Sequence, residues 1–137
     1  MKKLLSVIVF IAVLVVFIAL GCKQKEKSEE KGEKKYSIAV IPKGTTHVFW
    51  KSIHAGALKA EQELKDAGID VEVIWKGPLK EDDRESQIRV VEDFVTRGVS
   101  GIVLAPLDDA ALRVPVKNAV NYGIPVVIID SGLKSED

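Results

Sequence analysis

The chain has 137 residues, with 20 basic residues (Lys and Arg), 20 acidic residues (Asp and Glu) and a formal net charge of zero. Residues 1–35 carry eight lysines and four glutamates, whereas residues 36–137 carry 12 basic and 16 acidic residues. This acidic remainder argues against nucleic acid as a partner, because phosphate binding requires a concentrated basic surface. One cysteine and two histidines exclude an internal disulfide and a zinc-ligand spacing. Roughly 100 residues suffice for one domain with a core.

The amino-terminal segment has the organisation of an export signal. Two lysines precede an apolar run over residues 4–20, which ends in the sequence Ala-Leu-Gly-Cys. This ending resembles the lipobox of bacterial lipoproteins, although Ala19 stands where that pattern usually has Leu. The resemblance implies cleavage after Gly21 and acylation of Cys22, so that residues 1–22 form a lipoprotein signal peptide. An uncleaved membrane span with an incidental cysteine is the alternative.

A charged segment follows the cysteine. Residues 23–35 (KQKEKSEEKGEKK) contain no apolar side chain, so we expect a disordered tether. A lipid anchor and an uncleaved span both place the remaining chain outside the cytoplasm. We therefore expect residues 36–137 at the outer face of the cytoplasmic membrane, in the periplasm or cell envelope, held to the membrane through the lipid anchor.

Four short apolar runs in the rest of the chain are predicted to be strands. They cover Tyr36–Ile41, Val71–Trp75, Gly101–Ala105 and Val126–Asp130. The first, third and fourth runs are nearly continuous in apolar residues, which is typical of strands covered on both faces. The second run partly alternates between apolar and polar residues and is predicted to lie at an edge of the sheet.

Three segments with helical periodicity separate these runs. They cover about Val48–Ala67, Asp83–Arg97 and Asp109–Tyr122. The first has an apolar stripe with a four- or three-residue spacing, and the second has acidic residues in its first turn. Pro115 removes a backbone donor within the third segment, which predicts a kink or a restart near Val114.

The three predicted helices end alike. Gly68, Gly98 and Gly123 each follow a helical segment and precede an apolar residue, which is typical of a glycine in the left-handed conformation after a helix. The resulting order β-α-β-α-β-α-β, together with right-handed crossovers, predicts an α/β fold with a doubly wound parallel sheet.

In such sheets ligands bind beyond the carboxyl ends of the strands. The loop after the first strand contains His47, Phe49 and Trp50. Flat aromatic side chains suit the C–H faces of a sugar ring, and polar neighbours can bond its hydroxyls. The alternative for Phe49 is a core position with Trp50 alone exposed. We expect His47 to be a neutral polar contact rather than a catalytic group, and His54 to be a surface residue.

Carboxylates follow the third and fourth strands. Asp130 closes the fourth strand, where a pair of ligand hydroxyls could satisfy its carboxylate, and Ser131 follows it. The alternative is a turn or capping role. Asp108 is a candidate ligand contact, and either it or Asp109 is expected to cap the third helix. Lys43 and Lys76 could face the cleft, but solvated side chains are expected.

Several signatures of enzymes are absent. No GxGxxG motif follows the first strand, and no P-loop or GxSxG motif occurs, so the sequence predicts no cofactor, no metal and no catalytic residues. An α/β enzyme of the flavodoxin-like or hydrolytic kind is the least favoured class.

Residues 36–137 resemble the amino-terminal lobe of a type I periplasmic binding protein of the ribose- and galactose-binding group. The resemblance rests on THVFWKSIHAGA, EDDRESQIRVVEDFVTRGVSGIVLAPLD and NYGIPVVIIDSG. The family commonly has Asn-Pro-Phe-Phe in the first loop, where this chain has His47, Val48, Phe49 and Trp50. The family's Asp-Arg after the fourth strand is Asp130-Ser131 here, and this change puts ribose itself in doubt.

The resemblance implies a binding function. We expect an extracytoplasmic protein that binds a sugar or polyol and delivers it to an ABC permease, with a lobe that feeds a chemoreceptor or histidine kinase as the alternative. The family has two lobes that close over the ligand, and this chain ends seven residues after Asp130. We therefore expect a fragment or a truncated form, cut before the second lobe, with weak ligand binding.

Overall fold

The computed structural model describes residues 35–134. The predicted signal peptide, with Cys22, and almost all of the predicted tether lie outside the described residues. Within residues 35–134, no helix is long and apolar enough to cross a membrane.

Four parallel strands form one sheet. They are β1 (Tyr36–Ile41), β2 (Val71–Trp75), β3 (Gly101–Leu104) and β4 (Val126–Ile128). Their order is β2-β1-β3-β4, and each neighbouring pair is parallel. The predicted α/β sheet and the edge position of the second strand are confirmed. The third and fourth strands end one and two residues earlier than predicted.

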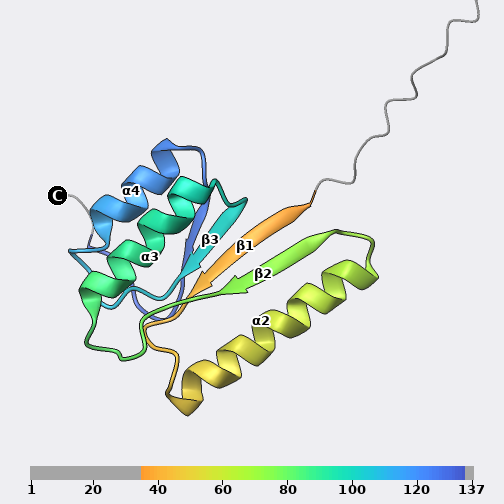
Figure 1. The fold of residues 1–137 in the computed structure, drawn as a ribbon, viewed down its shortest axis with the longest axis horizontal. Coiled ribbons are helices and arrows are strands. Elements are labelled where there is room, and N and C mark those ends of the chain that lie inside the picture. Colours follow the sequence, from red (N-terminus) through yellow and green to blue (C-terminus); the bar gives the residue numbers. More distant parts are fainter. Residues whose placement is uncertain (1–34, 135–137) are drawn as a thin grey trace, which may run out of the picture. The chain divides into compact units, whose positions relative to one another are not determined.

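Three helices cover the two faces of this sheet unequally. Figure 1 shows α2 (Val48–Asp66) alone on one face and α3 (Arg84–Arg97) beside α4 (Arg113–Asn121) on the other. This division follows from the strand order, because the crossover from β1 to β2 runs in the opposite direction to the crossovers that lead to β3 and β4.

The main core lies between the sheet and the helix pair α3 and α4. It is formed by the buried side chains of Ala39, Ile41, Val90, Val91, Phe94, Val99, Ile102, Leu104, Leu112, Ala119 and Ile124. On the other face, the predicted apolar stripe of α2 turns toward β1 and β2, where it lines an apolar cavity of about 300 Å³. The α2 side of β4 has no such cover among the described residues, and Val127 is 57% exposed. The prediction that the fourth strand is covered on both faces is therefore wrong, because α2, the single helix on this face, packs on β2.

Glycine ends all three helices as predicted. Gly68, Gly98 and Gly123 have φ values of 81°, 65° and 78°. In each case the glycine N–H bonds back to the carbonyl three residues earlier, and the following N–H bonds to the carbonyl five residues earlier. These paired bonds satisfy the last carbonyls of the helix, and the left-handed glycine makes them possible.

The third helix begins later than predicted. Residues 109–112 form turns, and α4 starts at Arg113. Pro115 therefore lies in the first helical turn, where a missing N–H leaves no helical bond unmade. The predicted restart near Val114 is confirmed, and the predicted start at Asp109 is wrong.

Candidate functional site

The loops after the four strands meet at the carboxyl edge of the sheet. The chain leaves β1 toward the face covered by α2 and leaves β3 toward the face covered by α4, although β1 and β3 are neighbours. This reversal makes the boundary between β1 and β3 the topological switch point, where doubly wound sheets form a ligand crevice. The predicted site residues lie on the loops after β1, β3 and β4 or at the helix starts that follow them.

The loop after β1 delivers its residues at the start of α2. His47 is the N-cap of this helix, and its Nδ1 accepts from the backbone N–H of Phe49 at 3.2 Å. This ring nitrogen satisfies one of the free backbone N–H groups of the first helical turn. The Phe49 side chain is 47% exposed, whereas Trp50 is 2% exposed. The two rings pack edge to face with centroids 4.9 Å apart. Phe49 thus presents the open aromatic surface, and Trp50 supports it from below.

The segment after β2 holds the indole of Trp50 in place. Trp50 Nε1 donates to a carboxylate oxygen of Glu81 at 2.7 Å. The hydroxyls of Thr45 and Thr46 donate to the carbonyls of Pro78 and Leu79 at 3.2 and 3.0 Å. These three bonds fasten the loop after β1 to the loop after β2. No pattern in the sequence predicts this role for Glu81.

Asp130 lies two residues beyond the end of β4 and adopts an uncommon backbone conformation. Its φ is 65°, in the left-handed region that non-glycine residues seldom occupy. Lys43 Nζ, on the loop after β1, lies 2.6 Å from its Oδ2, and the Ser131 hydroxyl lies 3.2 Å from the same oxygen. The hydrogen bond from Lys43 holds the pKa of Asp130 below its usual range. The expectation of a solvated Lys43 is wrong, because this side chain is 22% exposed and paired.

Asp108 has the predicted capping role in a modified form. Its Oδ1 accepts from the backbone N–H groups of Ala110 and Ala111 at 3.0 and 2.6 Å, and so caps the turn before α4. Arg84 NH1 lies 3.5 Å from the other oxygen. These backbone bonds, and then Arg84, lower the pKa of Asp108. The Asp108 side chain remains partly exposed, and its second oxygen faces the exposed guanidinium of Arg84.

Two residues have roles that the sequence did not indicate. Gln87 on α3 is fully buried and bonds to the loops after β1 and β3. Its polar side chain at a core position of the helix was the available signal. His54 stacks on Trp75 with ring centroids 4.5 Å apart, so the expectation of a simple surface position is wrong. This pair lies between α2 and the edge strand β2.

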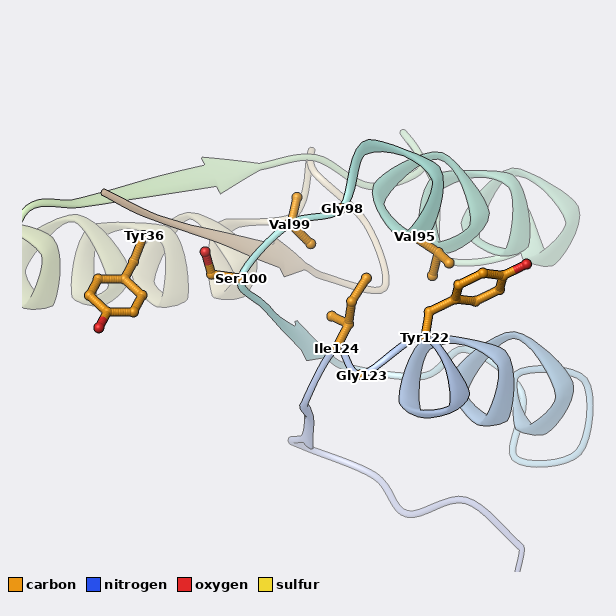
Figure 2. Close-up of a pocket in the computed structure, with 8 residues that line it drawn as sticks. All are labelled: Tyr36, Val95, Gly98, Val99, Ser100, Tyr122, Gly123 and Ile124. Atoms are coloured by element: carbon orange, nitrogen blue, oxygen red, sulfur yellow. The ribbon is translucent and has the colours of Figure 1, made fainter. Parts of the chain in front are cut away.

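A second hollow lies at the opposite end of the sheet. A cavity of about 420 Å³ lies near the ends of α3 and α4. Figure 2 shows Tyr36 and Tyr122 among the side chains that line it. It contains the helix-ending segments of Gly98 and Gly123 and none of the predicted site residues. No group of histidine, cysteine, aspartate and glutamate side chains suited to a metal ion occurs in residues 35–134.

The carboxyl edge therefore combines an exposed aromatic face with paired charges. Phe49 offers an apolar surface, the Lys43 ammonium offers hydrogen-bond donors, and the Asp130 carboxylate offers acceptors. A neutral molecule with an apolar ring face and adjacent hydroxyls matches these groups, since each hydroxyl can both donate and accept. Nothing in this set forms a nucleophile with an oriented base.

A doubly wound lobe with this edge defines a small-molecule binding domain. The chain belongs to the periplasmic binding proteins, since the family model described as "Periplasmic binding protein domain" matches residues 38–137.

Named relatives agree with this family. The chain is 34% identical over 130 residues to the D-ribose/D-allose-binding protein of Pseudomonas aeruginosa, covering 95% of this chain and 38% of the relative. It is 30% identical over 132 residues to the ribose import binding protein of Bacillus subtilis, covering 95% of this chain and 41% of that protein. The chain thus spans well under half the length of these relatives.

A solved structure shares both sequence and fold. An ABC transporter solute-binding protein from Agrobacterium vitis with bound D-fucose is 38% identical with a TM-score of 0.68, and the match covers 72% of this chain and 33% of that one. The likeness extends to the lobe described above and supports the predicted fold class, a periplasmic-binding-protein-like lobe.

Proposed function

We propose that this chain forms the ligand-binding lobe of an exported solute-binding protein that takes up a sugar or polyol for an ABC importer. The observation that carries the proposal is the Lys43–Asp130 pair, with its Nζ to Oδ2 distance of 2.6 Å, which joins the loops after β1 and β4 at the carboxyl edge of the sheet. The pair presents a donor and an acceptor side by side. Adjacent hydroxyls of a sugar complement both groups with charge-assisted hydrogen bonds.

The remaining contacts are assigned by their place at the same edge. Phe49 supplies the aromatic surface for a ring face, with Trp50 beneath it. His47, Ser131 and Asp108 supply polar groups at the rim. Relatives named for D-ribose, D-allose and D-fucose support a monosaccharide as the ligand class.

A panel of monosaccharides tests this proposal. The full chain is titrated with D-ribose, D-allose, D-fructose and D-fucose, and thermal shift and NMR chemical-shift changes are recorded. We expect at least one sugar to raise the melting temperature and to shift signals of Phe49 and Asp130. The absence of both responses for every sugar and related polyol would remove the sugar assignment. Asp130→Asn, which retains the shape of the side chain, is the matched control for the charged contact.

We also propose a lipid anchor at Cys22. The apolar run over residues 4–20 and the Gly21-Cys22 ending support it, and the charged segment 23–35 would separate the lobe from the membrane. Metabolic labelling with a fatty-acid analogue should mark the wild-type chain and not Cys22→Ser. Equal labelling of both would contradict the anchor, whereas membrane association without labelling of either would support an uncleaved span.

A further inference from the structure

Gln87 bonds to the loops on both sides of the switch point between β1 and β3. The last ladder bond between β1 and β3 runs from the N–H of Ala105 to the carbonyl of Ile41 at 2.9 Å. Immediately beyond it, the carbonyls of Pro42 and Ala105 both receive the side-chain amide of Gln87, at 3.0 and 2.8 Å. The two strands therefore continue as loops bridged by a side chain from α3.

The third contact of Gln87 orders the loop after β3. Its Oε1 accepts from the backbone N–H of Leu107 at 2.8 Å. The amide has two N–H donors and one carbonyl, so all three parts of this fully buried group have a backbone partner. A side chain in this state has one orientation, because each alternative leaves a buried polar group unpaired.

Each backbone partner of Gln87 adjoins either a residue of the candidate site or a residue bonded to one. Pro42 precedes Lys43, Leu107 precedes Asp108, and Ala105 precedes Pro106, whose carbonyl lies 3.4 Å from the Ser131 hydroxyl. A small displacement of these three backbone positions would therefore also displace Lys43, Asp108 and Ser131.

We infer that Gln87 is a positioning residue for the ligand crevice: it fixes the separation of the loops after β1 and β3 and thereby the placement of Lys43 and Asp108 for a bound ligand. The effect on a bound ligand rests on the proposed function, whereas the effect on the separation of the two loops does not. It explains why a polar amide lies among the apolar side chains of the core face of α3.

Gln87→Glu tests whether the hydrogen bonds of residue 87 position the two loops, because the charge of the introduced carboxyl depends on pH. The introduced carboxyl is buried beside two carbonyl oxygens, and both burial and these acceptors raise its pKa. When ionised it repels both carbonyls, and when protonated it donates to one of them and still accepts from the Leu107 N–H. The variant should therefore regain its crevice at low pH. Because protonation also relieves a general destabilisation of the fold, the folded fraction is measured by urea unfolding at each pH, and positioning requires a change in affinity that the folded fraction does not account for. Gln87→Met, which bonds to none of the three, should show no such recovery.

The affinity for D-ribose or D-allose is measured at pH 8 and pH 5 by NMR titration of the full chain. At pH 8 we expect the affinity of Gln87→Glu to be about tenfold lower than that of wild type. At pH 5 the ratio of the variant's affinity to that of wild type should be at least about threefold higher than at pH 8. The wild-type ratio corrects for effects of pH on ligand binding that do not involve residue 87. Val91→Ala, equally buried on the same helix, is the control and should lower stability with unchanged affinity.

Amide hydrogen exchange tests the same inference without a ligand. Gln87→Met should accelerate exchange in residues 42–50 and 105–109 relative to β3, and most strongly at the Leu107 N–H. Equal acceleration throughout the sheet, or an affinity of Gln87→Glu within twofold of wild type at both pH values, would overturn the inference. If wild type binds no sugar, the proposed function fails, and the pattern of exchange alone decides the role of Gln87.

Discussion

The two ends of the parallel sheet are built by different means. At the amino ends of the strands, each helix stops through bonds between residues three to five positions apart, made possible by a left-handed glycine. At the carboxyl ends, side chains join segments distant in sequence, as in the bond of Trp50 to Glu81 and the pair of Lys43 with Asp130. Ending a helix in this way requires one residue type, glycine, at one position. Joining segments that are distant in sequence requires several polar side chains, and these side chains can also face a ligand.

This difference implies that substitutions at the two ends should have separable effects. Changes at the glycine end should alter the free energy of unfolding and leave ligand affinity intact. Changes at the carboxyl end should alter affinity with small effects on stability. Changes in the core between them should lower stability at both ends of the sheet together.

The largest effect is expected for Phe94→Ala. The Phe94 side chain is fully buried between the helix pair and the sheet. Its truncation should lower the free energy of unfolding by about 3–5 kcal/mol, since it removes apolar contacts and leaves a cavity. Urea unfolding followed by circular dichroism measures this loss, and exchange at both ends of the sheet should rise together. Retained protection at one end would show that the two ends do not share this core.

The second effect concerns Asp130, whose φ of 65° suits glycine. Asp130→Gly removes the carboxylate but relieves the backbone, so stability should be unchanged or slightly higher. Affinity for D-ribose should fall about 10- to 100-fold, the range expected for loss of a charge-assisted hydrogen bond. Asp130→Ala removes the same group without relieving the backbone and should be less stable than Asp130→Gly. Equal stability of the two variants would show that the left-handed conformation carries no strain.

Gly98→Val provides the opposite outcome at the other end of the sheet. A Cβ at this position meets no atom within 4 Å, so the penalty comes from the φ of 65° alone. The free energy of unfolding should fall by about 1–2 kcal/mol, with ligand affinity unchanged. Thermal unfolding and a D-ribose titration measure the two quantities.

Gly56→Ala is the matched control for this substitution. Gly56 lies within α2, also with no atom within 4 Å of an added Cβ, and its φ is not positive. Alanine should raise the free energy of unfolding by up to about 1 kcal/mol. A loss of stability in both variants would assign the effect of Gly98→Val to something other than backbone conformation.

The same contrast explains how far the sequence could be interpreted. Local patterns predicted the glycine-terminated helix ends, the parallel α/β sheet and the edge position of β2, and the structure confirms all three. The capping role of Asp108 also follows from local hydrogen bonding, whereas the capping role of His47 was not predicted. Local signals failed where a distant partner decided the outcome, as for the solvated state expected of Lys43.

Aromatic exposure was a further point that the sequence left open. Phe49 and Trp50 are adjacent at the start of a helix, and periodicity alone does not decide which ring faces the sheet. Glu81, 31 residues away along the chain, provides the carboxylate that the buried indole N–H requires. The Asp130 carboxylate is likewise paired with Lys43, which lies on the loop after β1. Such pairings appear only once the loops are brought to one edge.

The smallest expected effect is the pH dependence contributed by the Lys43–Asp130 pair. Its hydrogen bond lowers the pKa of Asp130 from the ordinary value of 3.8. A carboxyl with a lowered pKa in the folded state stabilises the fold fully above its unfolded pKa, and this contribution is lost as the pH falls through the folded value. Because both side chains remain partly exposed, we expect less than about 1 kcal/mol.

Lys43→Met isolates this contribution, since it keeps an unbranched side chain and removes the charge. The difference in the free energy of unfolding between wild type and Lys43→Met should be constant from pH 7 to pH 5 and should shrink toward pH 3. A difference that stays constant to pH 3 would mean that Lys43 stabilises the fold through packing of its methylene groups rather than through Asp130. In that case the Asp130 carboxylate would owe its position to the backbone turn, and a ligand would meet an acceptor that is not already neutralised by a lysine.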